Sequence, residues 1–143
     1  MAYILVADDD EIVGELVCGA LIAAGHSAGY LTNGRDALAT IKQRRPDLLI
    51  LDCNMPELSG LLLLRELKNS PDLFDLPVLI LSGRRSDKDV ELAHFEGADD
   101  YMKKPFDAEE VVFRVEELLA RRRAPAPPVV RRAPTTGFGK RRS

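Results

Sequence analysis

Short apolar runs, separated by segments with helical periodicity, make up most of residues 1–120. Three of these runs, residues 3–7, 48–51 and 78–81, are continuously apolar. A continuous apolar run indicates a strand that is buried on both faces, as in a parallel sheet. Two weaker strands fit at residues 27–31 and 99–102. The pattern therefore predicts five strands.

Helical spacing occupies the intervals between and after these strands. Apolar residues recur three and four positions apart in five segments, within residues 12–24, 37–41, 61–67, 90–95 and 111–119. Gly25 suits the position after the first helix, and Pro46 closes the second. The fourth segment is short and weakly amphipathic, and the four leucines Leu61 to Leu64 cannot all face one core. Alternating strands and helices predict a doubly wound α/β fold with right-handed crossovers.

Charge divides the chain into two parts. Residues 121–143 contain eight Lys or Arg and no acid, so the net charge of −3 leaves −11 for residues 1–120. The same segment holds four of the nine prolines and no periodic apolar pattern. We predict one domain over residues 1–120 and a disordered, basic, Pro/Arg-rich tail over residues 121–143. Three roles are open for the tail. It could be a nearly inert extension, it could contact an anionic partner (nucleic acid, a membrane or an acidic protein), or it could bind weakly to the acidic domain of its own chain.

Composition and motifs exclude several classes of protein. No apolar run approaches the roughly 18 residues of a membrane span, and the N-terminus lacks the pattern of a signal peptide. The two cysteines supply neither a disulfide framework nor a zinc site, which favours the cytoplasm. The chain has no glycine-rich dinucleotide-binding motif and no Walker A motif. His26 and His94 fall away from the strand ends and are expected to be ordinary surface residues.

Polar residues stand at the ends of four of the five predicted strands. They are Asp8, Asp9 and Asp10 after the first strand, Asp52 after the third, Ser82 after the fourth and Lys104 after the fifth. Ligands of open parallel sheets bind outside the carboxyl ends of the strands. Acidic residues at such positions also cap helices, and Asp9 or Asp10 suits that role. Capping does not account for polar chemistry at four strand ends, so we expect one site there.

Three carboxylates at one edge of a sheet need a compensating charge. Two carboxylates about 4 Å apart repel by roughly 4 kcal/mol at an effective dielectric constant of about 20. An all-oxygen ligand set suits a hard divalent cation such as Mg²⁺, with Mn²⁺ as a substitute. A divalent cation, Lys104 and the Ser82 hydroxyl around a buried carboxylate suit a phosphoryl group, and an aspartate can itself be the nucleophile.

Five stretches of the chain resemble the receiver domain of bacterial two-component response regulators, the family of the chemotaxis regulators. They are residues 4–10, 46–52, 54–60, 77–82 and 97–106, in the family's order and spacing. The resemblance spans residues 3–120 and implies a flavodoxin-like, five-stranded parallel sheet of order 2-1-3-4-5 with five helices. Because only 23 residues follow Ala120, we expect a stand-alone receiver that acts by binding another protein.

The resemblance also implies a phosphoacceptor and a metal site, residue by residue. Asp52 matches the phosphoacceptor of the family. Asp9, Asp52 and the backbone carbonyl of Asn54 match its Mg²⁺ ligands, and Asp8 would act mainly through a metal-bound water. Asn54 and Arg84 flank the site at the positions that tune dephosphorylation.

A switch is implied by three further positions. Ser82 and Lys104 match the residues that contact the phosphoryl group, and Tyr101 matches an aromatic that packs inward on activation. Two or three new charged hydrogen bonds, worth about 1.5–3 kcal/mol each, reach the ~5.5 kcal/mol that inverts a 1:99 equilibrium. Pro105 is expected to follow a cis peptide bond, and the output surface would comprise the fourth helix, fifth strand and fifth helix.

The implied function is phosphorylation-activated signalling, without enzyme activity beyond intrinsic Mg²⁺-dependent self-phosphorylation and dephosphorylation. A sensor histidine kinase or phosphotransfer protein would be the donor, and an unidentified protein the downstream partner. One alternative is a scaffold or localisation module that works without phosphorylation, with tail contacts to anionic partners. Another is an aspartate-dependent phosphatase, which needs an acid where this chain has Asn54. An exposed leucine in the four-leucine run would suit a weak homodimer; otherwise we expect a monomer.

Overall fold

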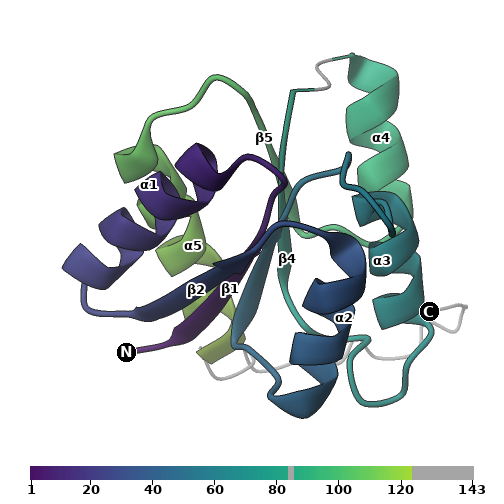
Figure 1. The fold of residues 1–143 in the computed structure, drawn as a ribbon, viewed down its shortest axis with the longest axis horizontal. Helices are drawn as coiled ribbons and strands as arrows, with labels where there is room; N and C mark the ends of the chain where they lie inside the picture. The colour runs from purple at the N-terminus through teal and green to yellow at the C-terminus, as the bar shows by residue number, and fades with distance from the viewer. Residues whose placement is uncertain (84–85, 124–143) are drawn as a thin grey trace, which may run out of the picture.

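The computed structural model describes residues 1–83 and 86–123 of the chain (Figure 1). Strands and helices alternate over these residues, as the sequence predicts. The strands are β1 (Tyr3–Ala7), β2 (Ser27–Leu31), β3 (Leu48–Leu51), β4 (Val78–Ser82) and β5 (Asp100–Lys103). The helices are α1 (Glu11–Ala23), α2 (Gly34–Gln43), α3 (Gly60–Lys68), α4 (Asp87–Phe95) and α5 (Ala108–Arg123). None of the described helices combines the length and apolarity that crossing a bilayer requires.

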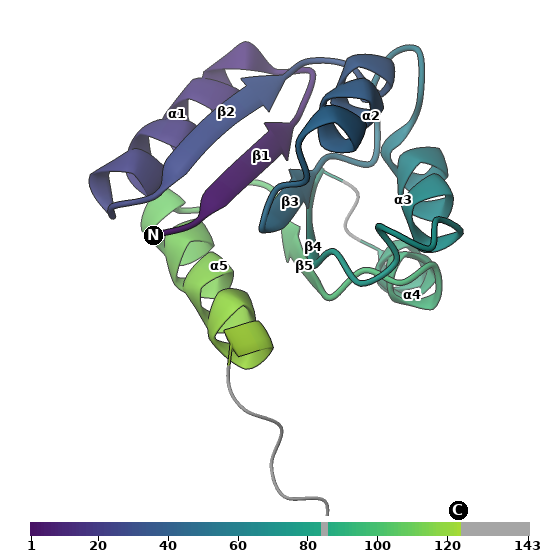
Figure 2. The same cartoon turned by 90° about the horizontal axis from the view of Figure 1, so that it is seen from below.

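The five strands form one parallel sheet in the order β2-β1-β3-β4-β5, which confirms the expected fold class. Helices α1 and α5 cover one face, and α2, α3 and α4 cover the other (Figure 2). Every residue of β3 and β4 is buried, which is the physical reason for their continuous apolar runs. Because all strands run the same way, the carboxyl ends of β1, β3, β4 and β5 lie at one edge.

Side-chain alternation along the central strands divides the interior into two cores. In β3, Leu49 and Leu51 pack into the core beneath α2, α3 and α4, whereas Leu48 and Ile50 pack into the core beneath α1 and α5. As expected, the four consecutive leucines do not all face the core. Leu63 and Leu64 are buried, and Leu62 is 48% exposed.

Local sequence signals account for where the helices begin and end. Four helices start at a side chain that accepts a backbone N–H of the first turn, namely Asp10, Asn33, Ser59 and Ser86. The cap of α1 is thus Asp10, not Asp9. Gly25 follows α1 with φ of +98°, a conformation that glycine adopts at little cost.

Two expectations about surface and boundaries are wrong. His26 is not a surface residue, since its side chain is only 8% exposed and its Nε2 lies 3.1 Å from Glu116 Oε2 of α5. The loop from α1 to β2 therefore packs against α5, a contact between distant segments that sequence spacing does not show. β5 begins at Asp100 rather than Asp99, because the Asp99 carboxylate accepts the N–H of Val78 at 2.8 Å.

Helix α4 agrees with the weak amphipathicity expected of it, whereas α5 extends beyond residue 120, where the predicted domain ends. The apolar residues Leu92 and Phe95 of α4 are 42% and 84% exposed, and Ala93 is the helix's one buried residue. Helix α5 continues to Arg123, into the segment for which disorder was predicted. The remaining part of the predicted tail, residues 124–143, lies outside the described residues.

Candidate functional site

The carboxylates of Asp8 and Asp52 meet at the carboxyl ends of two neighbouring strands. β1 pairs with β3 so that Ala7 lies beside Leu51, which places the next residue of each strand side by side. Asp8 is 1% exposed and Asp52 is 5% exposed, whereas Asp9 is exposed. One oxygen from each of the three carboxylates lies within 4.8 Å of the others. The predicted acidic cluster therefore exists, and two of its members are buried.

Lys104, the residue after β5, reaches the same cluster. Its Nζ lies 2.8 Å from Asp8 Oδ2 and 3.8 Å from Asp52 Oδ2. The backbone N–H of Lys104 donates to the carbonyl of Ser82 at 2.8 Å, and the Ser82 side chain is fully buried at the end of β4. Burial alone would lower the pKa of the Lys104 ammonium, but the hydrogen bond to Asp8 and the charge of Asp52 raise it overall. Lys104 is thus a persistent cation beside two buried carboxylates.

The Asp52 carboxyl titrates unusually high for an aspartate. Burial raises its pKa from 3.8 to about 6, and the charge of Asp8 adds to this effect. The Lys104 charge and the backbone N–H of Asn54, which donates to Asp52 Oδ1 at 3.3 Å, act in the opposite direction. A bound cation would therefore stabilise the ionised form of Asp52.

The loop after β3 is held tightly against the start of α3. The N–H of Gly60 donates to the carbonyl of Cys53 at 2.9 Å. A Cβ on Gly60 would overlap the carbonyl oxygen of Asp52 and lie 2.9 Å from Cys53 Cα. Gly60 is therefore a positioning residue of the Asp52 loop. Sequence reasoning gave it no such role, because the close approach arises only when α3 packs beside β3.

Asp8 is held by its own loop as well as by Lys104. The N–H of Asp10 donates to Asp8 Oδ1 at 2.9 Å, while the Asp10 carboxylate accepts the N–H of Ile12 at 2.9 Å. Of the three consecutive aspartates, one is thus a buried site residue, one an exposed site residue and one a helix cap.

The remaining predicted site residues are placed as follows. Tyr101 lies in β5, is 8% exposed and belongs to the core beneath α4, while its role in a switch stays a prediction. The Lys104–Pro105 peptide bond is cis, as expected. Asn54 is exposed next to the buried loop. Arg84 lies outside the described residues, so its position near the site stays a prediction.

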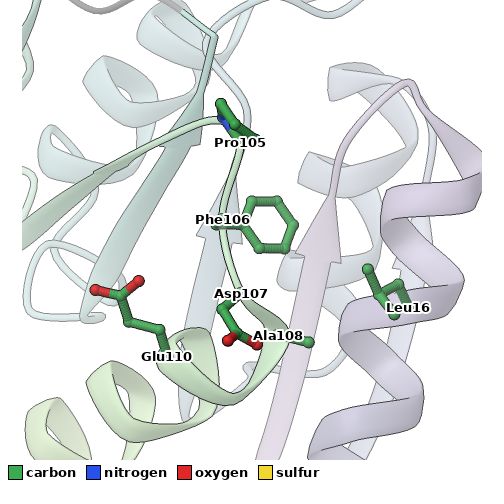
Figure 3. A pocket seen from close by; sticks show the side chains of 6 residues that line it. All are labelled: Leu16, Pro105, Phe106, Asp107, Ala108 and Glu110. Carbon is green, nitrogen blue, oxygen red and sulfur yellow. The ribbon is translucent and has the colours of Figure 1, made fainter.

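An open hollow of about 580 Å³ adjoins this edge on the side of α1 (Figure 3). Its lining comes from α1 and from the connection between β5 and α5, with Leu16, Pro105, Phe106, Asp107, Ala108 and Glu110. The Phe106 ring points from that connection toward α1. Ile12 and Leu16, one turn apart on α1, are 75% and 52% exposed. The surface beside the carboxylates is therefore partly apolar.

The donor set fits a hard divalent cation. It consists of three carboxylates on two strand ends, with two of them buried and the third open to solvent. Mg²⁺ takes oxygen ligands and keeps several waters, so an edge with one exposed carboxylate suits it. Within the described residues, no other group of His, Cys, Asp and Glu has ligand spacing.

Comparison with known proteins agrees with this arrangement. The family model of the response regulator receiver domain matches residues 4–116. The response regulator MprA of Mycolicibacterium vanbaalenii is 42% identical over 118 residues, which are 82% of this chain and 50% of that protein. MprA of Mycobacterium leprae is 41% identical over 118 residues, 82% of this chain and 51% of that protein. The chain thus spans about half the length of the curated relatives it matches.

Solved structures show the same fold. A putative response regulator from Chloroflexus aurantiacus superposes with a TM-score of 0.80 at 33% identity, covering 84% of this chain and 98% of that one. The receiver domain of the Francisella response regulator 1452 gives a TM-score of 0.80 at 31% identity, over 85% of this chain and 99% of that one. Matched over residues 4–116 and folded like these solved receivers, the chain belongs to the response regulator receiver domain family.

Proposed function

We propose that Asp52 accepts a phosphoryl group and that the phosphorylated domain signals by binding another protein. The observation that carries this proposal is the setting of Asp52, a buried carboxylate with the Lys104 ammonium at 3.8 Å and the Asp8 carboxylate close by. With its pKa raised to about 6, the carboxyl is mostly ionised near neutral pH and is a stronger nucleophile than an ordinary aspartate.

The proposed reaction is a transfer from a phosphohistidine. A carboxylate oxygen of Asp52 attacks the phosphorus, a P–O bond forms and the P–N bond breaks. The imidazole, protonated on its other nitrogen, leaves as a neutral ring with the electron pair of the broken bond. Lys104 and the Ser82 hydroxyl are proposed to hold the phosphoryl oxygens, because both belong to neighbouring strand ends at this edge. With acetyl phosphate, the P–O bond to acetate breaks instead.

Asp9, Asp52 and the backbone carbonyl of Asn54 are the proposed Mg²⁺ ligands, with Asp8 acting through a water. Bound Mg²⁺, or Mn²⁺ in its place, supplies positive charge that offsets the charge of the phosphoryl oxygens. The chain itself orients Asp8, through Lys104 on one oxygen and the Asp10 N–H on the other. This leaves Asp52 as the buried carboxylate without an equally short contact to Lys104.

The phosphodonor is proposed to be a sensor histidine kinase or phosphotransfer protein that covers the apolar surface next to Asp52. A donor histidine must reach Asp52, so its protein has to contact the neighbouring surface. Leu16 and Phe106 provide that surface at the hollow of Figure 3, and the exposed Ile12 lies one turn before Leu16 on α1. Ile12→Asp should slow transfer from a phosphorylated protein donor while leaving transfer from acetyl phosphate unchanged.

Tyr101 and the surface of α4, β5 and α5 are proposed to carry the output. Tyr101 belongs to the core beneath α4, so a change at the site reaches this surface through packed side chains. Tyr101→Ala should suppress the chemical-shift changes that beryllofluoride, a phosphoryl mimic, induces in α4 and α5. If beryllofluoride still induced the same chemical-shift changes in Tyr101→Ala as in the unmodified chain, Tyr101 would have no such role.

We place the function in the bacterial cytoplasm, in keeping with two buried cysteines that are free thiols.

The test of the proposed function is the intact mass of the full chain after incubation with Mg²⁺ and acetyl phosphate. We expect a gain of one phosphoryl group that is lost in Asp52→Asn and in EDTA. Asp36→Asn, at an exposed aspartate of α2, is the matched control and should retain the gain. A gain that persists in Asp52→Asn would refute the assignment. No gain with either acetyl phosphate or a phosphorylated donor protein would favour the phosphorylation-independent scaffold.

A further inference from the structure

The negative charge of the domain is concentrated in the layer of α1 and α5, which cover the same face of the sheet (Figure 2). Residues 8–23, which contain α1, hold five acids and no Lys or Arg, and residues 107–120 of the α5 region hold five acids and one base, Arg114. Ten acids against one base give these two segments a net charge of −9, out of −11 for residues 1–120. Arg114 is itself paired with Asp100 at 2.9 Å. This layer is therefore strongly acidic, whereas the rest of the domain is nearly neutral.

The hollow of Figure 3 lies within this acidic layer. Leu16 of α1 and the ring of Phe106 give it an apolar surface, and the exposed residues Asp107 and Glu110 give it two carboxylates. None of the six residues that line it is basic. A volume of about 580 Å³ takes several side chains. The hollow therefore suits a ligand that has apolar and cationic groups next to each other.

The chain itself contains a segment of this chemistry. Residues 129–132 read Val-Val-Arg-Arg, so that two apolar side chains directly precede two cations. Residues 124–143 together hold five Lys or Arg and no acid. A cationic segment is attracted to a layer of opposite charge, and a segment of the same chain is present there at an effective concentration on the order of millimolar. Even weak contacts are then enough for docking.

The position of this segment in the sequence matches the distance to the hollow. Helix α5 begins beside the hollow at Ala108 and ends at Arg123, and a helix of 16 residues is about 24 Å long. Six to nine residues of extended chain cover about 20–30 Å. If the chain runs back along α5 from Arg123, residues 129–132 are therefore the ones that reach the hollow.

We propose that residues 129–132 dock in the hollow of their own chain, with the two valines on its apolar surface and the two arginines at its carboxylates. The docked segment covers Leu16 and Phe106, the surface that the phosphodonor is proposed to contact. A donor protein then has to displace the segment before its histidine reaches Asp52, so the contact is self-inhibitory. The self-inhibition rests on the proposed function, whereas the docking itself does not.

Paramagnetic relaxation in the full chain tests the docking. A nitroxide is attached through Ala133→Cys, next to the segment. The native thiols of Cys18 and Cys53 are buried, and burial raises the pKa of the Cys18 thiol to about 11, so the label goes to the new cysteine. We expect faster relaxation of the amides of Leu16 and Phe106 and no effect in α3, which lies in the other layer.

Two double variants with the same change in charge show whether docking is specific to the segment. Arg131→Glu with Arg132→Glu should weaken the docking, and with it the relaxation at the hollow, by about fivefold, the size expected for two exposed ion pairs. Arg141→Glu with Arg142→Glu lies farther along the chain and is the matched control, which should retain the relaxation. Equal loss in both double variants would mean attraction by net charge alone and would overturn the docking.

A mixed sample shows whose segment fills the hollow. It combines isotope-labelled chains that lack the nitroxide with nitroxide-labelled chains that lack the isotope, so only contacts between chains are seen. We expect no faster relaxation of the Leu16 and Phe106 amides in this sample. Relaxation as strong as within one chain would assign the hollow to the segment of a second copy, and absence of relaxation in both samples would show that the segment does not dock; either result overturns the proposal.

Phosphorylation by acetyl phosphate separates the docking from the proposed function. This small donor needs no protein surface, so the gain in intact mass should have the same rate in the unmodified chain and in Arg131→Glu with Arg132→Glu. A rate changed by this variant and not by the control variant would mean that the segment acts on the carboxylates themselves, which overturns the self-inhibition by covering. If acetyl phosphate gives no gain in any chain, the proposed function is contradicted, while relaxation at Leu16 and Phe106 still decides the docking.

Discussion

Replacing Asp52 with Asn should stabilise the fold at neutral pH. The Asp52 carboxyl is buried beside Asp8, and its pKa is raised from 3.8 to about 6 because burial and the neighbouring negative charge disfavour ionisation. Ionising this group therefore costs more free energy in the folded chain than in the unfolded chain. Asn has nearly the same shape and no charge, so Asp52→Asn removes the cost.

The sign and size of the effect follow from proton linkage. Well below pH 3.8 the carboxyl is protonated in both states and contributes nothing. As the pH rises to about 6, the unfolded chain ionises first, and the folded state loses stability; above that the loss is constant. A pKa displaced from 3.8 to about 6 corresponds to about 3 kcal/mol, which solvent screening at this edge reduces to about 2 kcal/mol.

Urea unfolding in EDTA measures this directly. Asp52→Asn should exceed the unmodified chain in free energy of unfolding by about 2 kcal/mol at pH 7.5, and the difference should shrink to about 0.5 kcal/mol near pH 4. Asp9→Asn, at the exposed carboxylate of the same cluster, should give a clearly smaller gain. Added Mg²⁺ should reduce the advantage of Asp52→Asn, since the cation compensates the wild-type charge.

Two results would refute this reasoning. An Asp52→Asn variant no more stable than the unmodified chain at pH 7.5 would mean that the Asp52 charge is already well compensated by Lys104. A gain that persists unchanged to pH 4 would mean that the stabilisation comes from altered packing and not from the carboxylate charge.

Three further predictions test the site and its support. Gly60→Ala should destabilise the fold by about 3 kcal/mol or more, because the added methyl meets the backbone of Asp52, whereas Gly19→Ala, in open space on α1, should stabilise it by up to about 1 kcal/mol; equal urea midpoints for the two variants would contradict this. Lys104→Met should cost about 2 kcal/mol at pH 7.5 by leaving Asp8 unpaired, and an unchanged unfolding free energy would show that Asp8 needs no cation. Phosphorylation by acetyl phosphate should slow as the pH falls and the Asp52 carboxyl becomes protonated, and because bound Mg²⁺ favours the charged carboxylate, more Mg²⁺ should move the midpoint of the rate profile further below the metal-free pKa of about 6; a midpoint that does not depend on the Mg²⁺ concentration would contradict this.

The order of elements and the residues at the strand ends could be predicted from the sequence. Buried strands such as β3 and β4 are continuously apolar because both of their faces are covered, and that leaves a direct trace in the sequence. Helix starts at Asn33 and Ser59 follow from capping by their own side chains. Once all strands run parallel, Asp8 and Asp52 must come to the same edge. Apolar runs and helix caps are properties of each segment itself, and the shared edge follows from the parallel direction of the strands.

The contacts that give the site its electrostatics were decided only by tertiary structure. That Lys104 lies 2.8 Å from Asp8 but 3.8 Å from Asp52 depends on how β5 continues past β4. The close approach of Gly60 to Asp52, the burial of His26 beside Glu116 and the Arg65–Glu96 pair join residues from separate elements. The exposure of Leu92 and Phe95 likewise depends on what α4 packs against. Distances and burial of this kind arise from packing between distant segments, whereas apolar pattern and capping report only on each segment itself.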